Sequence, residues 1–276
     1  MAYPVVSAPY GLKPVSLIGG QVFAGSTREY PIQYAYAANI FYGDAVTLAR
    51  GSIVRAVVNT TGAVAGVFLG CSYTNPTTKQ KLFSQYWPTG TLAGDAVAIV
   101  SDDPDAVFKA VVCSGTTVVG ATNKAMIGQN MAMIDTAAGN IAAGNSTNAV
   151  LAVVAAGAPA PTATLPLRVL DVVRETAVTV SVPSTSTATT TITIPASPVA
   201  ILAGSNVAFI AANGQLVETG SFVTTAVAVG GTTIALNLAS QVTIPAAAVI
   251  VITQYTEVLV KLNFGISSYY TALAAA

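Results

Sequence analysis

The sequence predicts a mainly β protein with an extended N-terminal arm, a β core domain and a β module inserted into that core. Apolar and polar residues alternate in several short segments, such as "VTVSV" at 178–182 and "EVLVKLNF" at 257–264, as they do in half-buried strands. Asn-Gly at 213–214 stands between two apolar runs, which is the strongest local signal of a β-hairpin. Helical periodicity is scarce, and only 123–135 and 146–156 are expected to form short helices.

The arm and the first strand are assigned to residues 1–40. This stretch is rich in Tyr and Pro, and its beginning has no pattern able to form a core of its own. We expect it to dock on a neighbouring surface, because a Pro-containing segment loses less entropy on ordering than a Gly/Ser tail. The alternative is that it folds back as an edge strand of its own domain.

The core domain is assigned to 41–175 and completed by 255–276, with the inserted module at 176–254. Glu218 is the single charged residue of the module, whereas charges return on both sides of it. The alternative is a consecutive second domain with a C-terminal strand of its own. Within the module, Gly-Gly at 230–231 predicts a second hairpin, and the apolar run at 244–255 predicts a buried strand.

Composition excludes several classes of protein. Mean hydropathy is +0.66, yet no run of about 18 apolar residues is uninterrupted, so no membrane span is expected. Eleven basic and eleven acidic residues give zero net charge, and the scattered basic ones argue against nucleic-acid binding. No signal peptide is visible, which predicts synthesis in the cytoplasm. Cys71 and Cys113 are expected to be buried free thiols.

No catalytic constellation is found. The chain has no histidine, which removes the commonest general base, the Ser-His-Asp and Cys-His arrangements and every zinc site containing histidine. The P-loop and Gly-x-Gly-x-x-Gly patterns are also missing. We therefore expect no enzyme, no cofactor, no metal ion and no small-molecule substrate.

Three carboxylates lie close together in "SDDPDAVFKAVV" at 101–112. Asp103 suits the first position of a type I turn and Pro104 the second, and the residues after Asp105 then form a strand. The other interpretations are a cation or partner salt bridge, and catalysis. Calcium loops need further oxygen ligands and a Gly, and paired catalytic carboxylates normally come from separate elements.

Eight segments, in order, carry a resemblance to a known family: "SAPYGLKPVSLIGGQVFAGSTREYPI", "IFYGDAVTL", "GVFLGCSYT", "VSDDPDAVFKA", "IGQNMAMID", "GNSTNAV", "ATLPLRVLDVV" and "EVLVKLNFGISSYY". Together they resemble the head-decoration (capsid cement) proteins of tailed bacteriophages, of the marine and freshwater type. The resemblance covers residues 1–175 and 254–270. The chain departs from those proteins by carrying 176–254 between two strands that are close in sequence in the relatives.

The resemblance implies a core domain like a β-barrel or β-tulip, with a small β-sandwich-like module inserted. It implies a virion protein on the outer surface of the capsid that stabilises it by bridging capsomers of the major capsid protein. Such a protein commonly acts as a homotrimer.

Residues expected to contact the capsid or another partner are aromatic or proline residues of the arm with a leucine between them, the only tryptophan, and two carboxylates of the acidic turn. They are Tyr3, Pro4, Tyr10, Leu12, Pro14, Trp87, Asp102 and Asp105. For Trp87, packing in a core or loop is the alternative. Two other functions stay open: another virion component, such as a head fibre or tail protein, and an adhesin that binds a host surface or glycan through 176–254.

Overall fold

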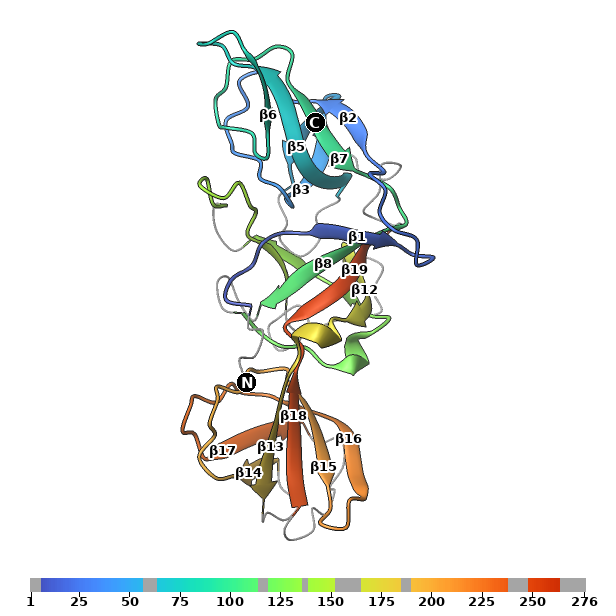
Figure 1. Cartoon of the computed structure of the whole chain (residues 1–276), viewed down its shortest axis with the longest axis vertical. Coiled ribbons are helices and arrows are strands. Elements are labelled where there is room, and N and C mark those ends of the chain that lie inside the picture. Colours follow the sequence, from blue (N-terminus) through green and yellow to red (C-terminus); the bar gives the residue numbers. More distant parts are fainter. Residues whose placement is uncertain are drawn as a thin grey trace.

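The computed structural model has three β-sheets that follow one another along the long axis of the molecule (Figure 1). Besides strands, its described residues form two short 3-10 helices, η1 (Lys124–Met126) and η2 (Arg174–Thr176). The prediction of a mainly β chain is confirmed. The structure describes residues 6–56, 64–113, 119–135, 139–151, 165–184, 190–237 and 248–263.

The upper sheet curls until its two outer strands meet. Its order is β2 (Arg28–Pro31), β7 (Val97–Ser101), β5 (Gly66–Thr74), β3 (Ala45–Ala49) and β4 (Ser52–Arg55), and β6 (Lys81–Ser84) pairs with β5. Ile32, directly after β2, forms a parallel bridge with Ile53 of β4. Both isoleucines are buried in the core that the curled sheet encloses.

The middle sheet returns on itself as a barrel does. Its order is β10 (Met133–Asp135), β11 (Asn148–Leu151), β8 (Ala106–Cys113), β19 (Glu257–Leu262), β12 (Leu167–Val172) and β9 (Asn130–Met131). Only Ala132 separates the first and last strands of this order, so one run of six residues lines both edges. Closure of this kind removes exposed edges. The expected β-barrel-like core is thus confirmed.

The two helices expected from the sequence are wrong where the structure describes them. Residues 130–135 form β9 and β10, preceded by Gly128 at φ +85°, a conformation that interrupts a helix. Residues 148–151 form β11, in which all four side chains are buried. Barrel closure therefore outweighs the helical propensity of the Ala and Met residues.

The lower sheet is built from residues 178–254. Its order is β13 (Val178–Ser184), β18 (Ala248–Gln254), β15 (Asn206–Ile210), β16 (Leu216–Val223), β17 (Thr233–Asn237) and β14 (Thr191–Thr193). The predicted buried strand is β18, which lies between β13 and β15. The Asn-Gly hairpin is confirmed, since Gly214 at φ +81° lies in the turn that joins β15 to β16.

The tight hairpin predicted at Gly230 and Gly231 is wrong, because the two glycines lie within a longer connection between the paired strands β16 and β17. Val227, before the two glycines, bridges Ile201, whereas β17, after them, pairs with β14 and β16. The backbone of the glycine pair hydrogen-bonds Ser197 instead. The residues directly on the two sides of this glycine turn therefore pair with other segments of the lower sheet and not with each other.

The pairing of β12 with β19 in the middle sheet bears on the domain organisation. β12 and β19, which flank 176–254 in the sequence, are antiparallel neighbours in the middle sheet. Residues 41–175 contribute strands to two sheets, the upper and the middle. The division into arm, core and inserted module stays a prediction, and this pairing is the arrangement that an insertion between two neighbouring strands has.

Candidate functional site

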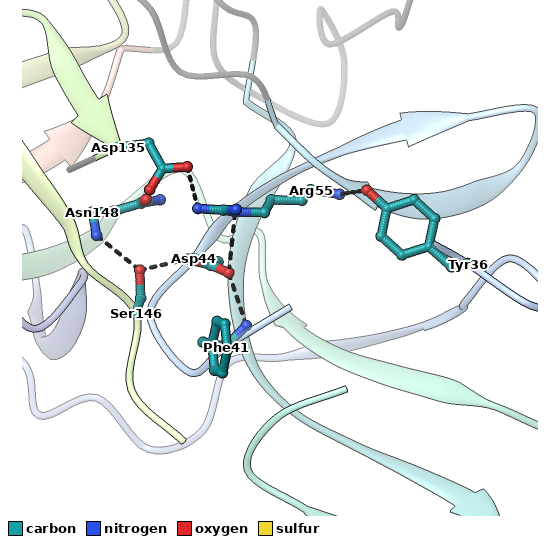
Figure 2. Close-up of polar contacts among 7 residues, drawn as sticks. All are labelled: Tyr36, Phe41, Asp44, Arg55, Asp135, Ser146 and Asn148. Carbon is teal, nitrogen blue, oxygen red and sulfur yellow. Dashed lines mark hydrogen bonds and ion pairs between the residues drawn. The ribbon is translucent and has the colours of Figure 1, made fainter. Parts of the chain in front are cut away.

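A polar network joins the upper sheet to the middle sheet (Figure 2). Asp44 lies just before β3 and Arg55 ends β4, both in the upper sheet. Asp135 ends β10, and Ser146 and Asn148 lie at the start of β11, in the middle sheet. Side chains from opposite sides of the junction therefore meet around one guanidinium group.

Arg55 is the centre of this network. Its Nε lies 3.5 Å from Oδ2 of Asp44, an ion pair without hydrogen-bond geometry, and its Nη2 donates to Asp135. Asp44 is fully buried and also accepts hydrogen bonds from the Phe41 backbone N–H, at 2.8 Å, and from the Ser146 hydroxyl. Every acceptor that Asp44 offers is thus used within the chain.

The charges of this network lie at the junction of the two sheets and are paired with each other. Burial raises the pKa of Asp44 and of Asp135, and the positive charge of Arg55 opposes both shifts. The two clefts described below are lined by neither carboxylate. The ion pair and hydrogen bond of Arg55 thus fix the upper sheet against the middle sheet.

A second polar cluster holds the N-terminal segment on the middle sheet. The Tyr10 hydroxyl donates to Glu257, a side chain of β19 that is only 2% exposed. Nζ of Lys109 lies 3.5 Å from the same carboxylate oxygen, and Nζ of Lys13 lies 4.3 Å from the centre of the Tyr10 ring. Burial, followed by the hydrogen bond and the charge of Glu257, raises the pKa of Tyr10. This tyrosine is therefore engaged within its own chain.

The other predicted contact residues of the arm are placed as follows. Leu12 is fully buried, and its backbone N–H donates to the Gly43 carbonyl. Pro14 lies half-buried in β1 (Lys13–Leu17), which pairs antiparallel with β8. Tyr3 and Pro4 lie outside the described residues. From residue 13 the segment is an edge strand of its own chain, the alternative that the sequence left open, and a buried Leu12 offers no surface to a partner.

Trp87 lies in the core of the upper sheet. Its side chain is fully buried, and its ring meets Tyr73 edge-on with centroids 5.2 Å apart. A buried indole cannot anchor a partner at the surface. The geometry favours core packing over the contact role expected for this residue.

The acidic turn is tied to its own chain. The Ala106 backbone N–H donates to the Asp103 carbonyl at 3.1 Å, which confirms the predicted turn. Asp102 is paired with Arg28 of β2 at 3.2 Å and accepts the Tyr30 hydroxyl at 2.6 Å. Asp105 is exposed. The turn connects β7 of the upper sheet to β8 of the middle sheet, so the Asp102 contacts hold this crossing.

Burial makes both cysteines weak nucleophiles. Cys71 and Cys113 are buried free thiols, as predicted, and burial raises the pKa of Cys71 to about 12 and that of Cys113 to about 11. The described residues hold no group of acidic or cysteine side chains placed to bind a metal ion. Neither short helix in the described ranges has the length and apolar run that crossing a bilayer requires.

Among the clefts lined by described residues, two open on the surface beside the sheets discussed above. One of about 450 Å³ lies beside β5 and β6, and the exposed Phe83 and the half-exposed Tyr42 contribute to its lining. The other, of about 480 Å³, lies over β8, β19 and η2, with Lys109 and Leu259 in its wall. No protein-family model matches the sequence, and no curated protein matches it.

Sequence reasoning missed the members of both polar clusters, above all Asp44, Arg55 and Glu257. The contacts that join Arg55 to Asp135 and Tyr10 to Glu257 span 80 and 247 positions of the chain, so no local pattern identifies them. One signal was present. In a chain with 8% charged residues, a charge placed against an apolar strand, as in "SIVRAVV" and "YTEVLV", marks a side chain that needs a buried partner.

Proposed function

We propose that this protein is a capsid decoration protein, which binds the outer surface of a phage capsid and stabilises it by bridging capsomers of the major capsid protein. The observation that carries the proposal is the serial arrangement of three curled sheets (Figure 1). An elongated body of this kind suits a bridge between separate points on a surface. Many of its charged side chains form ion pairs within the chain.

The resemblance described above supports the proposal through its distribution. Its segments supply the N-terminal strand and strands of the upper and middle sheets, whereas the lower sheet consists of 178–254, which the resemblance does not cover. The lower sheet is therefore the part that distinguishes this chain from the proteins that it resembles. Virion location, the major capsid protein as partner and a homotrimer belong to the same proposal.

A glycan-binding role for 176–254 gains no support from the aromatic residues there. Phe209 is fully buried in the core of the lower sheet and cannot stack on a sugar. Phe222 is half-buried, and the other phenylalanine, Phe209, offers no exposed ring beside it. We therefore keep the lower sheet as an extension of the decoration protein.

Mixing the purified protein with expanded, undecorated capsids tests the proposal. Stoichiometric binding that raises the temperature of capsid disruption is expected, because a ligand that binds the intact lattice better than the loosened one stabilises it. Absence of binding at micromolar concentration would refute the proposal.

A further inference from the structure

The outer face of the middle sheet carries two pairs of like charges on neighbouring strands. Lys13 of β1 is the cross-strand partner of Lys109 of β8, and Arg168 of β12 is the cross-strand partner of Lys261 of β19. These are four of the eleven basic residues of the chain. Like charges directly opposite each other destabilise a sheet. An anion beside either pair would therefore relieve this repulsion.

The direction of the side chains follows from the alternation along each strand. Arg168 stands between two residues of the buried core, and so does Lys261. Successive side chains of a strand point to opposite faces, so both charged side chains point away from the core. Arg168 is exposed and Lys261 is half-buried. The core neighbours are Leu167, Val169, Val260 and Leu262.

The first pair has its compensation inside the chain. The Glu257 carboxylate lies 3.5 Å from Nζ of Lys109. The ring of Tyr10 lies under both ammonium groups, 4.3 Å from that of Lys13 and 5.8 Å from that of Lys109. A carboxylate and an aromatic face together offset two neighbouring positive charges.

The second pair has no such compensation among the described residues. No carboxylate there lies within 4.0 Å of Arg168 or Lys261, although other ion pairs of the chain meet this distance. Asp171, on the same strand as Arg168, is 4.0 Å from Arg174, and Glu257, on the same strand as Lys261, is engaged by Lys109. The acidic groups of these two strands are thus committed elsewhere.

The larger cleft adjoins this pair. Its wall includes Lys109, Leu259 and Asp171, which are paired across β8, β19 and β12. Leu259 lies two residues before Lys261 on β19 and therefore on the same face. Val15 and Leu259 supply apolar lining. The face thus combines an uncompensated basic pair with a cleft of about 480 Å³ able to take an apolar side chain.

We propose that this face binds a carboxylate-bearing segment of a partner protein, with its carboxylates on Arg168 and Lys261 and an apolar side chain in the cleft. A nucleic acid fits less well, because two basic side chains are too few to follow a phosphate backbone and the apolar Val15 and Leu259 of the cleft offer it no contact. The inference stands on the two charge pairs and the cleft. If the proposed function holds, the segment belongs to the capsid surface.

The test uses a fluorescent glutamate-rich peptide carrying one leucine, an oligo-dT strand of equal charge, and the full-length protein at low ionic strength. The variant Arg168→Gln with Lys261→Gln is expected to weaken peptide binding about tenfold or more, the size of one lost charge-assisted contact. Its melting temperature is expected to equal or exceed that of the parent, because a like-charge pair has been removed. The matched control, Arg50→Asn with Lys79→Asn, removes two exposed charges from turns of the upper sheet. Both residues have a left-handed backbone conformation, which asparagine tolerates.

Three results would overturn the inference: equal peptide binding by both variants, tighter binding of oligo-dT than of peptide, or a melting temperature lowered only in the Arg168 and Lys261 variant. Undecorated capsids separate this inference from the proposed function. Capsid binding that is unchanged in the variant refutes this face but leaves the decoration function standing. Peptide binding that depends on the pair, without any capsid binding, supports the face and refutes the decoration function.

Discussion

Replacing Arg55 by methionine tests whether the junction between the upper and middle sheets is held by charge. Methionine replaces the apolar stem of the side chain and removes the guanidinium group, so Asp44 loses its ion pair and Asp135 loses its hydrogen bond. Asp44 keeps the Phe41 N–H and the Ser146 hydroxyl, which limits the damage.

The expected loss in the free energy of unfolding is about 3 kcal/mol at neutral pH. Breaking one side of a fully buried ion pair costs about 3–5 kcal/mol. The lower end applies because the side chains of Arg55 and Asp135 are 21% and 26% exposed, although that of Asp44 is fully buried. With a urea dependence of about 2 kcal/mol per molar, the unfolding midpoint falls by about 1.5 M.

Trp87 makes the assay specific. It is the only tryptophan of the chain and is fully buried in the upper sheet. Its fluorescence therefore reports unfolding of the sheet to which Arg55 belongs. Arg55→Lys, which keeps the charge but not the planar fork, is expected to fall between the parent and methionine variants. Arg50→Asn, at an exposed turn of the same unit, should change stability by less than about 0.5 kcal/mol.

The pH dependence of the stability loss distinguishes an electrostatic role of Arg55 from a packing role. Burial raises the folded-state pKa of Asp44 and Asp135 above the unfolded value, so their contribution to stability is largest in acid and is lost as pH rises through the folded pKa. Removing Arg55 raises both pKa values further, so the variant loses more than the parent as pH rises. The penalty should therefore be smaller at pH 4.5 than at pH 7.5. An equal penalty at the two pH values would refute an electrostatic role for Arg55.

Three further predictions concern other parts of the chain. Tyr10→Phe removes the hydroxyl donor to the buried Glu257, whose second oxygen has no partner among the described residues, and should cost about 1–3 kcal/mol. Cys71 and Cys113 should resist a thiol reagent at pH 8 until urea unfolds the protein, because burial raises their pKa values. Excision of 176–254, with a short glycine link, should leave the upper and middle sheets folded, since the flanking strands β12 and β19 are paired in the middle sheet.

Each of these predictions has a contrary outcome. Tyr34→Phe, at a side chain 60% exposed, is the control for the tyrosine, and an equal effect of both substitutions would exclude the hydrogen bond as the cause. Rapid modification of a thiol in the native protein would contradict its burial. Loss of the cooperative Trp87 transition in the excised protein would show that the lower sheet shares its core with the rest.

Local signals predicted local structure well. The Asn-Gly hairpin, the turn at Asp103 and the buried strand β18 follow from turn chemistry and from an apolar β-branched run, and all three are found. The Gly-Gly hairpin failed because two glycines permit a reversal without choosing which strands pair across it. The helix expected at 123–135 failed because its propensity is weak and local, whereas closure of the middle sheet depends on partners far along the chain.

The scarcity of charge explains why the candidate sites escaped prediction and what they do. Apolar contacts between Ala- and Val-rich surfaces are non-directional, so they hold neighbouring sheets together without setting their angle. Hydrogen-bonded ion pairs are directional, and this chain places them where elements from different parts of the fold meet: Arg55 between the upper and middle sheets, Asp102 beside the crossing into β8, and Glu257 under the N-terminal segment. A buried pair of this kind adds little net stability but can specify one arrangement. By the same reasoning, the Arg168 and Lys261 pair differs from the Lys13 and Lys109 pair: strand pairing fixes both, but only the second has a counter-charge, Glu257, on a strand beside it.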